Sequence, residues 1–213
     1  MGFIAERCVL SPFTPRVLDE CHTFVCGSED MDEFFRSDFA DYAHYLMGKS
    51  YCFRLKDDLK RIVCAFTISN DSIRIYDLPR SRRDHMKSIT HHKKHLRRYP
   101  GVLIGRLAVA QDFANQGIGS ELLNFIKALF SDNELLTGCR FIIVDAVNTT
   151  QVLSFYQKNG FKFLFTTEQQ ELLYTYPPKK TKDQIDIDRL QTRLMYFDLL
   201  TLRIQSDMND NHN

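Results

Sequence analysis

The N-terminal third of the chain carries one helical and two strand-like patterns of hydrophobic residues. From Ser28, a residue type that caps helices, apolar side chains recur at helical spacing and form a stripe: Met31, Phe34, Phe35, Phe39 and Tyr42. Two apolar runs follow, Tyr51–Leu55 and Ile62–Ser69, separated by the polar segment 56–60. We expect the stripe to lie in the core and the two runs to pair as an antiparallel hairpin.

The second half of the chain alternates between strand-like runs and amphipathic helices. The run Leu103–Ala110 predicts a strand, and the apolar residues that follow recur at steps of three and four, which predicts a helix: Ile118, Leu122, Ile126, Leu129 and Phe130. Later segments predict a buried strand, a helix ended by Gly160, another strand and a closing strand: 140–146, 149–159, 161–167 and 192–204. This order indicates an α/β (α+β) fold with a mixed sheet.

Gly117 and Gly119 lie at the junction between the predicted strand and the predicted helix. Glycine lets backbone N–H groups approach an anion closely, and the first turn of a helix supplies unpaired donors and the positive end of its dipole. The spacing matches neither the three glycines of a dinucleotide-binding fold nor the G-K-[ST] of a Walker loop. The junction therefore predicts a phosphate site of another class, although two glycines alone are also typical of a simple turn.

Composition favours one soluble, cytoplasmic domain. With 213 residues, 44% of them hydrophobic, the chain is long enough for one well-buried core, which we place in residues 1–204, with a polar and disordered tail at 205–213. Six cysteines without a C-x-x-C pair favour reduced thiols over disulfides or zinc. No apolar run approaches the roughly 20 residues of a membrane span, and Glu6 and Arg7 interrupt the N-terminal segment where a signal peptide is apolar.

A basic segment, residues 80–98, stands out from a nearly neutral chain whose net charge is +1. Its cations are interrupted only by Asp84, and they are Arg80, Arg82, Arg83, Lys87, Lys93, Lys94, Arg97 and Arg98. Such a cluster is typical of contact with a phosphate backbone, and equally of a solvated surface insertion. His91 and His95 lie one helical turn apart, but no carboxylate or thiol ligand is near them, so we expect no metal site.

Two long segments resemble the acetyl-CoA-binding core of the GNAT superfamily of N-acetyltransferases: GRLAVAQDFANQGIGSELL and FIIVDAVNTTQVLSFYQKNGF. The family's pyrophosphate motif, [Q/R]-x-x-G-x-[G/A], aligns with residues 114–119, where Ala114 replaces the usual Gln or Arg. The second segment keeps the pattern N-x6-F-Y-x-x-x-G-F from Asn148 to Phe161. The resemblance implies a mostly antiparallel, twisted sheet that is splayed between two central strands and flanked by helices.

A narrower resemblance links three further patches, FVCGSEDMDEFF, CAFTIS and IGRLAV, to GNAT toxins that acetylate the amino group of aminoacyl-tRNA. It implies acetyl-CoA as co-substrate and charged tRNA as acceptor, contacted through Arg80 to Arg98. Relatives of this kind are commonly homodimers, and the sequence does not define an antitoxin partner. A small-molecule or peptide amine acetyltransferase and a non-catalytic acyl-CoA-binding module remain the alternatives.

The family resemblance also assigns roles to residues. It implies that one strand and the following loop contact the coenzyme, together with Asn148: Leu107, Ala108, Val109, Asn115, Gln116, Gly117, Ile118, Gly119 and Ser120. Tyr156 is the candidate proton donor to the leaving thiolate, and packing of its helix on the sheet is the alternative. The strand lacks the Glu that lysine acetyltransferases of the superfamily use, which favours an α-amine with a pKa of about 7.7–8.0 over a lysine amine near about 10.4. Asp145 is either a base acting through water or a structural carboxylate.

Overall fold

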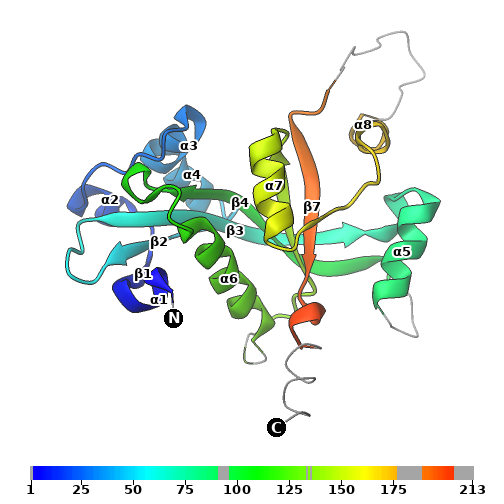
Figure 1. The fold of residues 1–213 in the computed structure, drawn as a ribbon, viewed down its shortest axis with the longest axis horizontal. Helices are drawn as coiled ribbons and strands as arrows, with labels where there is room; N and C mark the ends of the chain where they lie inside the picture. Colours follow the sequence, from blue (N-terminus) through cyan, green and yellow to red (C-terminus); the bar gives the residue numbers. More distant parts are fainter. Residues whose placement is uncertain (1, 91–95, 133, 135, 177–188, 204–213) are drawn as a thin grey trace. The chain divides into compact units, whose positions relative to one another are not determined.

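The protein forms two compact units, Met1–Asn70 with Leu103–Asn133 and Asp71–Val102 with Glu134–Asn213. Figure 1 shows the computed structural model, which describes residues 2–90, 96–132, 134, 136–176 and 189–203. Its seven strands have the order β1-β2-β3-β4-β5-β7-β6 in the sheet. Helices flank this open sheet, and the strand pairs β1–β2, β2–β3, β5–β7 and β6–β7 are antiparallel. The predicted fold class is confirmed.

The first unit begins with three short elements that the sequence patterns did not predict. They are α1 (Phe3–Arg7), β1 (Cys8–Pro12) and α2 (Pro15–Glu20). β1 pairs with β2 (Lys49–Leu55), and β2 pairs with β3 (Ile62–Arg74). The predicted hairpin is therefore confirmed, and its second strand continues five residues beyond the predicted end at Ser69 because Ile73 is buried.

The predicted stripe from Met31 to Tyr42 lies in the core of this unit. It is carried by α3 (Glu29–Glu33), a π-helical turn at Phe34–Asp38 and α4 (Phe39–His44). Phe34, Phe35 and Phe39 are buried in one cluster, against which Met31 and Tyr42 pack. Ser28 is the N-cap residue as predicted, but its side chain makes no capping hydrogen bond.

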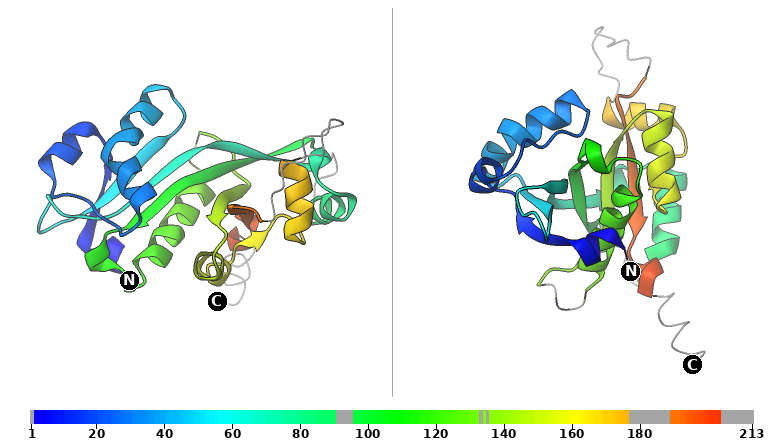
Figure 2. Two further views of the ribbon diagram at one scale, coloured as in Figure 1. Left: turned by 90° about the horizontal axis from the view of Figure 1, so that it is seen from above. Right: turned by 60° about the vertical axis from the view of Figure 1, so that its left-hand side comes forward.

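Alternation along β2 and β3 gives the sheet of the first unit two buried faces. Cys52 and Ala65 belong to the phenylalanine cluster of α3 and α4. Phe53 and Phe66 pack against Phe125 of α6 (Ile118–Ser131), with ring centroids 4.9 and 6.4 Å apart. Helices therefore cover both faces, as Figure 2 shows for α2–α4 on one side and α1 and α6 on the other. Strands buried on both faces explain the nearly continuous apolar run at 62–66.

The second unit is built on β5 (Phe141–Val147), which pairs along its whole length with β7 (Thr192–Asp198). The predicted helix 149–159 is α7 (Thr150–Lys158), and Thr149 caps it by accepting a hydrogen bond from the Val152 amide at 3.4 Å. Gly160 ends it with φ +80°, as the sequence predicts. The basic segment contains α5 (Arg80–Thr90), and residues 91–95 lie outside the described part of the chain.

The prediction of a strand over 161–167 is wrong for most of its length. Only β6 (Lys162–Phe163) pairs with β7, and the chain then turns into α8 (Glu168–Thr175), which the sequence patterns did not predict. Thr167 caps the start of this helix, because its hydroxyl accepts a hydrogen bond from the Gln170 amide at 3.3 Å. The predicted closing strand 192–204 likewise ends at Asp198, while the predicted tail at 205–213 lies outside the described residues.

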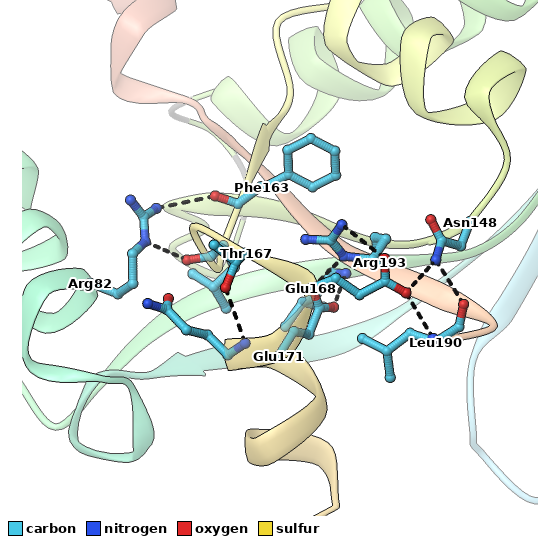
Figure 3. Close-up of polar contacts among 11 residues, drawn as sticks. Arg82, Asn148, Phe163, Thr167, Glu168, Glu171, Leu190 and Arg193 are labelled. Atoms are coloured by element: carbon cyan, nitrogen blue, oxygen red, sulfur yellow. Dashed lines mark hydrogen bonds and ion pairs between the residues drawn. The ribbon is translucent and has the colours of Figure 1, made fainter. Parts of the chain in front are cut away.

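Helix α8 is fixed to the second unit by a buried polar network around Arg193, which is 8% exposed (Figure 3). Arg193 Nε donates to Glu171 at 2.8 Å, and Glu168 lies 4.0 Å from the same guanidinium. Asn148 Nδ2 donates to both Glu168 and the Leu190 carbonyl at 2.8 Å. The network ties α8, the end of β5 and the start of β7 together.

Replacing Arg193 by methionine is expected to lower the free energy of unfolding by about 3 kcal/mol, because Glu171 stays buried without its cation. The double variant Arg193→Met with Glu171→Leu is expected to recover most of this loss, since no uncompensated charge remains. Urea unfolding of the wild type and both variants measures the effect. Equal stabilities of the single and double variants would contradict the proposed coupling.

Candidate active site

The predicted phosphate loop joins β4 (Arg98–Val109) to α6. A single 3₁₀ turn at Gln111–Phe113 leads into it, and its residues 114–117 are exposed. Gly117 is the N-cap residue with φ +82°, and a Cβ placed there would meet no atom within 4 Å. Glycine is therefore favoured here by the left-handed backbone and not by lack of space.

Three backbone donors at the start of α6 are free to hold an anion. The amides of Ser120 and Glu121 donate to the Gly117 carbonyl at 3.0 and 3.1 Å. Within the described part of the chain, the amides of Gly117, Ile118 and Gly119 have no acceptor. Unpaired N–H groups and the helix dipole together favour a phosphate group at this position.

The loop is mounted rigidly, which preserves the aim of these amides. Ile118 is buried, and so are Leu122, Leu123 and Ile126 behind it on α6. In the loop, Gln116 Nε2 donates to the Asp112 carbonyl at 3.0 Å, and the Asp112 carboxylate pairs with Arg61 at 2.6 Å. Contacts within the protein therefore hold the loop at both ends.

Glu121 is the one acid in the first turn of α6, where a carboxylate would oppose a bound phosphate. Its two oxygens instead accept hydrogen bonds from the amides of Phe3 and Ile4 at 3.1 and 2.8 Å. The short N-terminal helix α1 thus engages this carboxylate. These two hydrogen bonds offset the negative charge of Glu121 near the phosphate loop. No cation at position 114, where the family has Gln or Arg and this chain has Ala114, is needed for this.

The strand residues predicted to contact the coenzyme immediately precede the loop. Ala108 is buried against the phenylalanine cluster, whereas Leu107 and Val109 on the opposite face are half-buried. Ala110, the next residue, is held by its amide, which donates to the Val63 carbonyl at 2.8 Å. The backbone at 107–109 is therefore fixed in the sheet of the first unit.

Tyr156, the predicted proton donor, lies on α7 in the second unit and is 9% exposed. Its ring packs between Phe155 and Phe161, with centroids 5.1 and 5.2 Å away. Within the described residues the hydroxyl has no hydrogen-bond partner. Burial raises the pKa of Tyr156 to about 12, so it holds its proton throughout the neutral range.

Asn148 is committed to the network around Arg193. Both hydrogen bonds of its amide nitrogen go to Glu168 and Leu190, and its backbone carbonyl accepts from Arg189 at 2.8 Å. Its coenzyme contact stays a prediction, and the amide nitrogen is not free to make it.

Asp145 lies on β5, three residues before Asn148. Desolvation raises the pKa of its carboxyl group, and repulsion from Asp71 adds to the effect. A raised pKa makes a carboxylate a better proton acceptor near neutral pH. The Asp145 side chain is exposed, and its role as a base acting through water stays a prediction.

The structure also shows a cavity of about 420 Å³ in the first unit that the sequence patterns did not predict. Gly105 and Arg106 of β4 line it together with side chains of the π-turn and α4, among them Asp38, Asp41 and Tyr42. Arg106 lies 3.8 Å from Asp30 and 5.1 Å from the Phe34 ring, and its buried Nε atom has no partner among the described residues. The cavity can hold a small polar group. The sequence could not predict it, because its helical residues and Arg106 are more than 60 positions apart and no local pattern connects them.

Residues 86–163 match the sequence profile described as an acetyltransferase (GNAT) domain. The chain contains a GNAT acetyltransferase domain. The matched residues include the loop 114–120, Asn148 and Tyr156, so the predicted family and enzyme class are confirmed. The comparison with curated proteins found no match.

Solved structures extend the similarity of the GNAT domain to nearly the whole chain. AtaT complexed with acetyl-methionyl-tRNAfMet has a TM-score of 0.65 at 15% identity, over 93% of this chain and 98% of that one. A variant of KacT with one tyrosine replaced by phenylalanine has the same score and identity over 94% and 99%. AtaTR bound with AcCoA also has a TM-score of 0.65 at 15% identity, over 94% and 98%. At such low identity these matches establish the shared fold.

A membrane-spanning helix is absent from the part of the chain that the structure describes.

Proposed function

We propose that the protein is an acetyl-CoA-dependent N-acetyltransferase. The observation that carries the proposal is the set of free amides at Gly117, Ile118 and Gly119, aimed by a rigid loop at the start of α6. These donors fit the diphosphate of the coenzyme, and AtaTR, a protein of the same fold, has been solved with AcCoA. In the proposal, residues 107–109 and 115–120 contact the coenzyme, and residues 1–204 act as one domain.

The chemistry is transfer of an acetyl group from sulfur to nitrogen. A neutral amine attacks the thioester carbonyl, the new C–N bond forms, the C–S bond breaks, and the thiolate leaves. Tyr156 serves this step as a hydrogen-bond donor to the departing sulfur, because its high pKa keeps it protonated. The nitrogen loses one proton, which passes through water to Asp145. Asp145 then returns this proton through water to the thiolate, so that coenzyme A leaves as a neutral thiol and Asp145 is a carboxylate again.

The proposed acceptor is the α-amine of an aminoacyl-tRNA. Support comes from AtaT, which has this fold and has been solved in complex with acetyl-methionyl-tRNAfMet, and from the basic segment of this chain. An α-amine has a usable neutral fraction near pH 7, in keeping with a site whose base acts only through water. A toxin role, a homodimer, an antitoxin partner and a cytoplasmic location are parts of the same proposal, and the six free cysteines suit a reducing compartment.

A small cationic amine is the second candidate acceptor. The cavity beside Arg106 carries Asp38 and Asp41, two carboxylates suited to an ammonium group. If a small amine enters there, Asp41→Asn is expected to raise KM for that amine about tenfold and to leave kcat nearly unchanged, since it removes uniform binding. Asp57→Asn, an exposed carboxylate outside the cavity, is the matched control.

Incubation with radiolabelled acetyl-CoA and either charged tRNA or a panel of free amines separates the two acceptors. The proposal predicts label in aminoacyl-tRNA, released as N-acetyl amino acid after ester hydrolysis. Label in free amines alone would reject the tRNA acceptor, and no label in either despite coenzyme binding would reject the enzyme.

A further inference from the structure

A second cavity, of about 360 Å³, lies in the other unit and is strongly basic. Arg74, Arg97 and Arg98 line it together with Tyr76 and a single acid, Asp77. Among the described residues, one of the three arginines has a carboxylate partner in the cavity, since Arg74 pairs with Asp77 at 3.4 Å. Arg97 and Arg98 are exposed, so the cavity presents guanidinium groups to solvent.

The aromatic residue of this cavity is held in a fixed position. Tyr76 lies in a 3₁₀ turn, Ile75–Asp77, whose first residue is fully buried. The Ile75 amide donates to the Arg97 carbonyl at 3.1 Å, which ties the turn to the start of β4. Tyr76 as a whole nevertheless remains 50% exposed.

Two further cations pack over the same ring. Arg83 lies 5.9 Å and Lys87 5.8 Å from its centroid. Both come from α5 at a spacing of four residues, so they share one side of that helix. With both cations in place Tyr76 stays half exposed, so part of its surface remains accessible to a ligand.

Arg82 does not contribute to this surface, although it belongs to the basic segment. Its guanidinium donates to the carbonyls of Leu164 and Phe163 at 2.6 and 3.1 Å, as Figure 3 shows. In the described part of the basic segment, Arg82 is therefore structural and Arg80 pairs with Asp84 at 3.9 Å, whereas four cations lie near Tyr76: Arg83, Lys87, Arg97 and Arg98. Arg74, which precedes the basic segment in the sequence, also lines the cavity and adds a further cation near Tyr76.

We propose that the Tyr76 cavity binds an unpaired nucleotide of a nucleic acid, with its base stacked on Tyr76 and its phosphates on Arg74, Arg97 and Arg98. An exposed aromatic ring beside several arginines is the arrangement by which proteins bind single strands without reading sequence. Inorganic anions and acidic peptides can use the arginines, but they gain nothing from the ring. The inference rests on the proposed function only in taking the partner to be a nucleic acid.

Fluorescence anisotropy of a labelled single-stranded 12-nucleotide oligouridylate, without acetyl-CoA, tests the site. Tyr76→Ala is expected to weaken binding roughly tenfold, and Tyr76→Phe, which keeps the ring, to bind like the wild type. The double variant Arg97→Gln, Arg98→Gln is expected to reduce the slope of log K against log salt by roughly 1.4. Arg16→Gln with Arg36→Gln removes the same charge from exposed side chains outside the cavity and outside the basic segment, and is the matched control.

Competition experiments and the acetyl-transfer assay show which results would contradict the inference. Competition by polyglutamate equal to that of unlabelled RNA, or equal binding by the wild type and Tyr76→Ala, would overturn the inference. Weaker competition by oligothymidylate than by RNA would support the site and name RNA as the partner. If RNA binding depends on Tyr76 but no acceptor is acetylated, only the proposed function is rejected. If tRNA is acetylated but RNA binding is the same for the wild type and Tyr76→Ala, only this inference is rejected.

Discussion

Replacing Tyr156 by phenylalanine is expected to lower kcat for acetyl transfer about a hundredfold while leaving the Kd for acetyl-CoA unchanged. The substitution removes only the hydroxyl, which has no partner within the described part of the chain, and keeps the ring that packs against Phe155 and Phe161. Stability should therefore be preserved, and the loss should fall on the chemical step. Single-turnover kinetics and titration calorimetry measure the two effects separately.

Tyr174→Phe is the control for this prediction, because Tyr174 lies in the same unit on α8 and is partly exposed. It should leave kcat unchanged. The pH profile gives a second check, since a Tyr156 pKa of about 12 means that its deprotonation should not limit the rate below about pH 10. A Tyr156→Phe variant with wild-type kcat would show that the residue only packs its helix on the sheet.

Placing a carboxylate at position 117 is expected to weaken acetyl-CoA binding at least roughly tenfold, because the new charge faces the diphosphate. Aspartate is among the few side chains that tolerate the left-handed backbone, and a Cβ at Gly117 meets no atom within 4 Å, so the fold should survive Gly117→Asp. The weakening should diminish at high salt.

Gly117→Asn is the matched control, because it has nearly the same shape and backbone preference without the charge. Gly27 has φ +86° and equally open surroundings in the same unit, so Gly27→Asp controls for a carboxylate elsewhere. Titration calorimetry of all three variants measures the Kd. Equal affinities of the Asp and Asn variants at position 117 would contradict a diphosphate at this loop.

The sequence predicted those elements around the candidate site that depend on residues close together in the chain. The glycine at position 117 indicated a turn, and the structure shows a left-handed backbone there. The apolar spacing from Ile118 onward predicted the buried face of α6, which anchors the loop. The stripe from Met31 to Tyr42 and the Thr149-capped helix α7 were predictable for the same reason, since each depends on residues within a few positions of one another.

What the sequence did not reveal depends on contacts between distant residues. Glu121 accepts hydrogen bonds from Phe3 and Ile4, which precede it by more than a hundred residues in the sequence. Helix α1 itself is five residues long, which is too short to show a helical period. Arg193 and Glu171 form a buried pair that neither local segment indicates. Helix α8 is different, because Thr167 and Gln170 have the spacing of a capping box, a local signal that could have identified its start.

Titration of the wild type and Gly117→Asp with acetyl-CoA and with acetyl-pantetheine tests the central claim most directly. Acetyl-pantetheine keeps the thioester but lacks the diphosphate and the adenosine 3′-phosphate, and the variant isolates the share that belongs to the diphosphate. If the amides of Gly117, Ile118 and Gly119 hold the diphosphate, acetyl-CoA should bind at least roughly a hundredfold more tightly than acetyl-pantetheine, and Gly117→Asp should remove much of that difference. Equal affinity for the two compounds, or no heat with acetyl-CoA, would contradict the account.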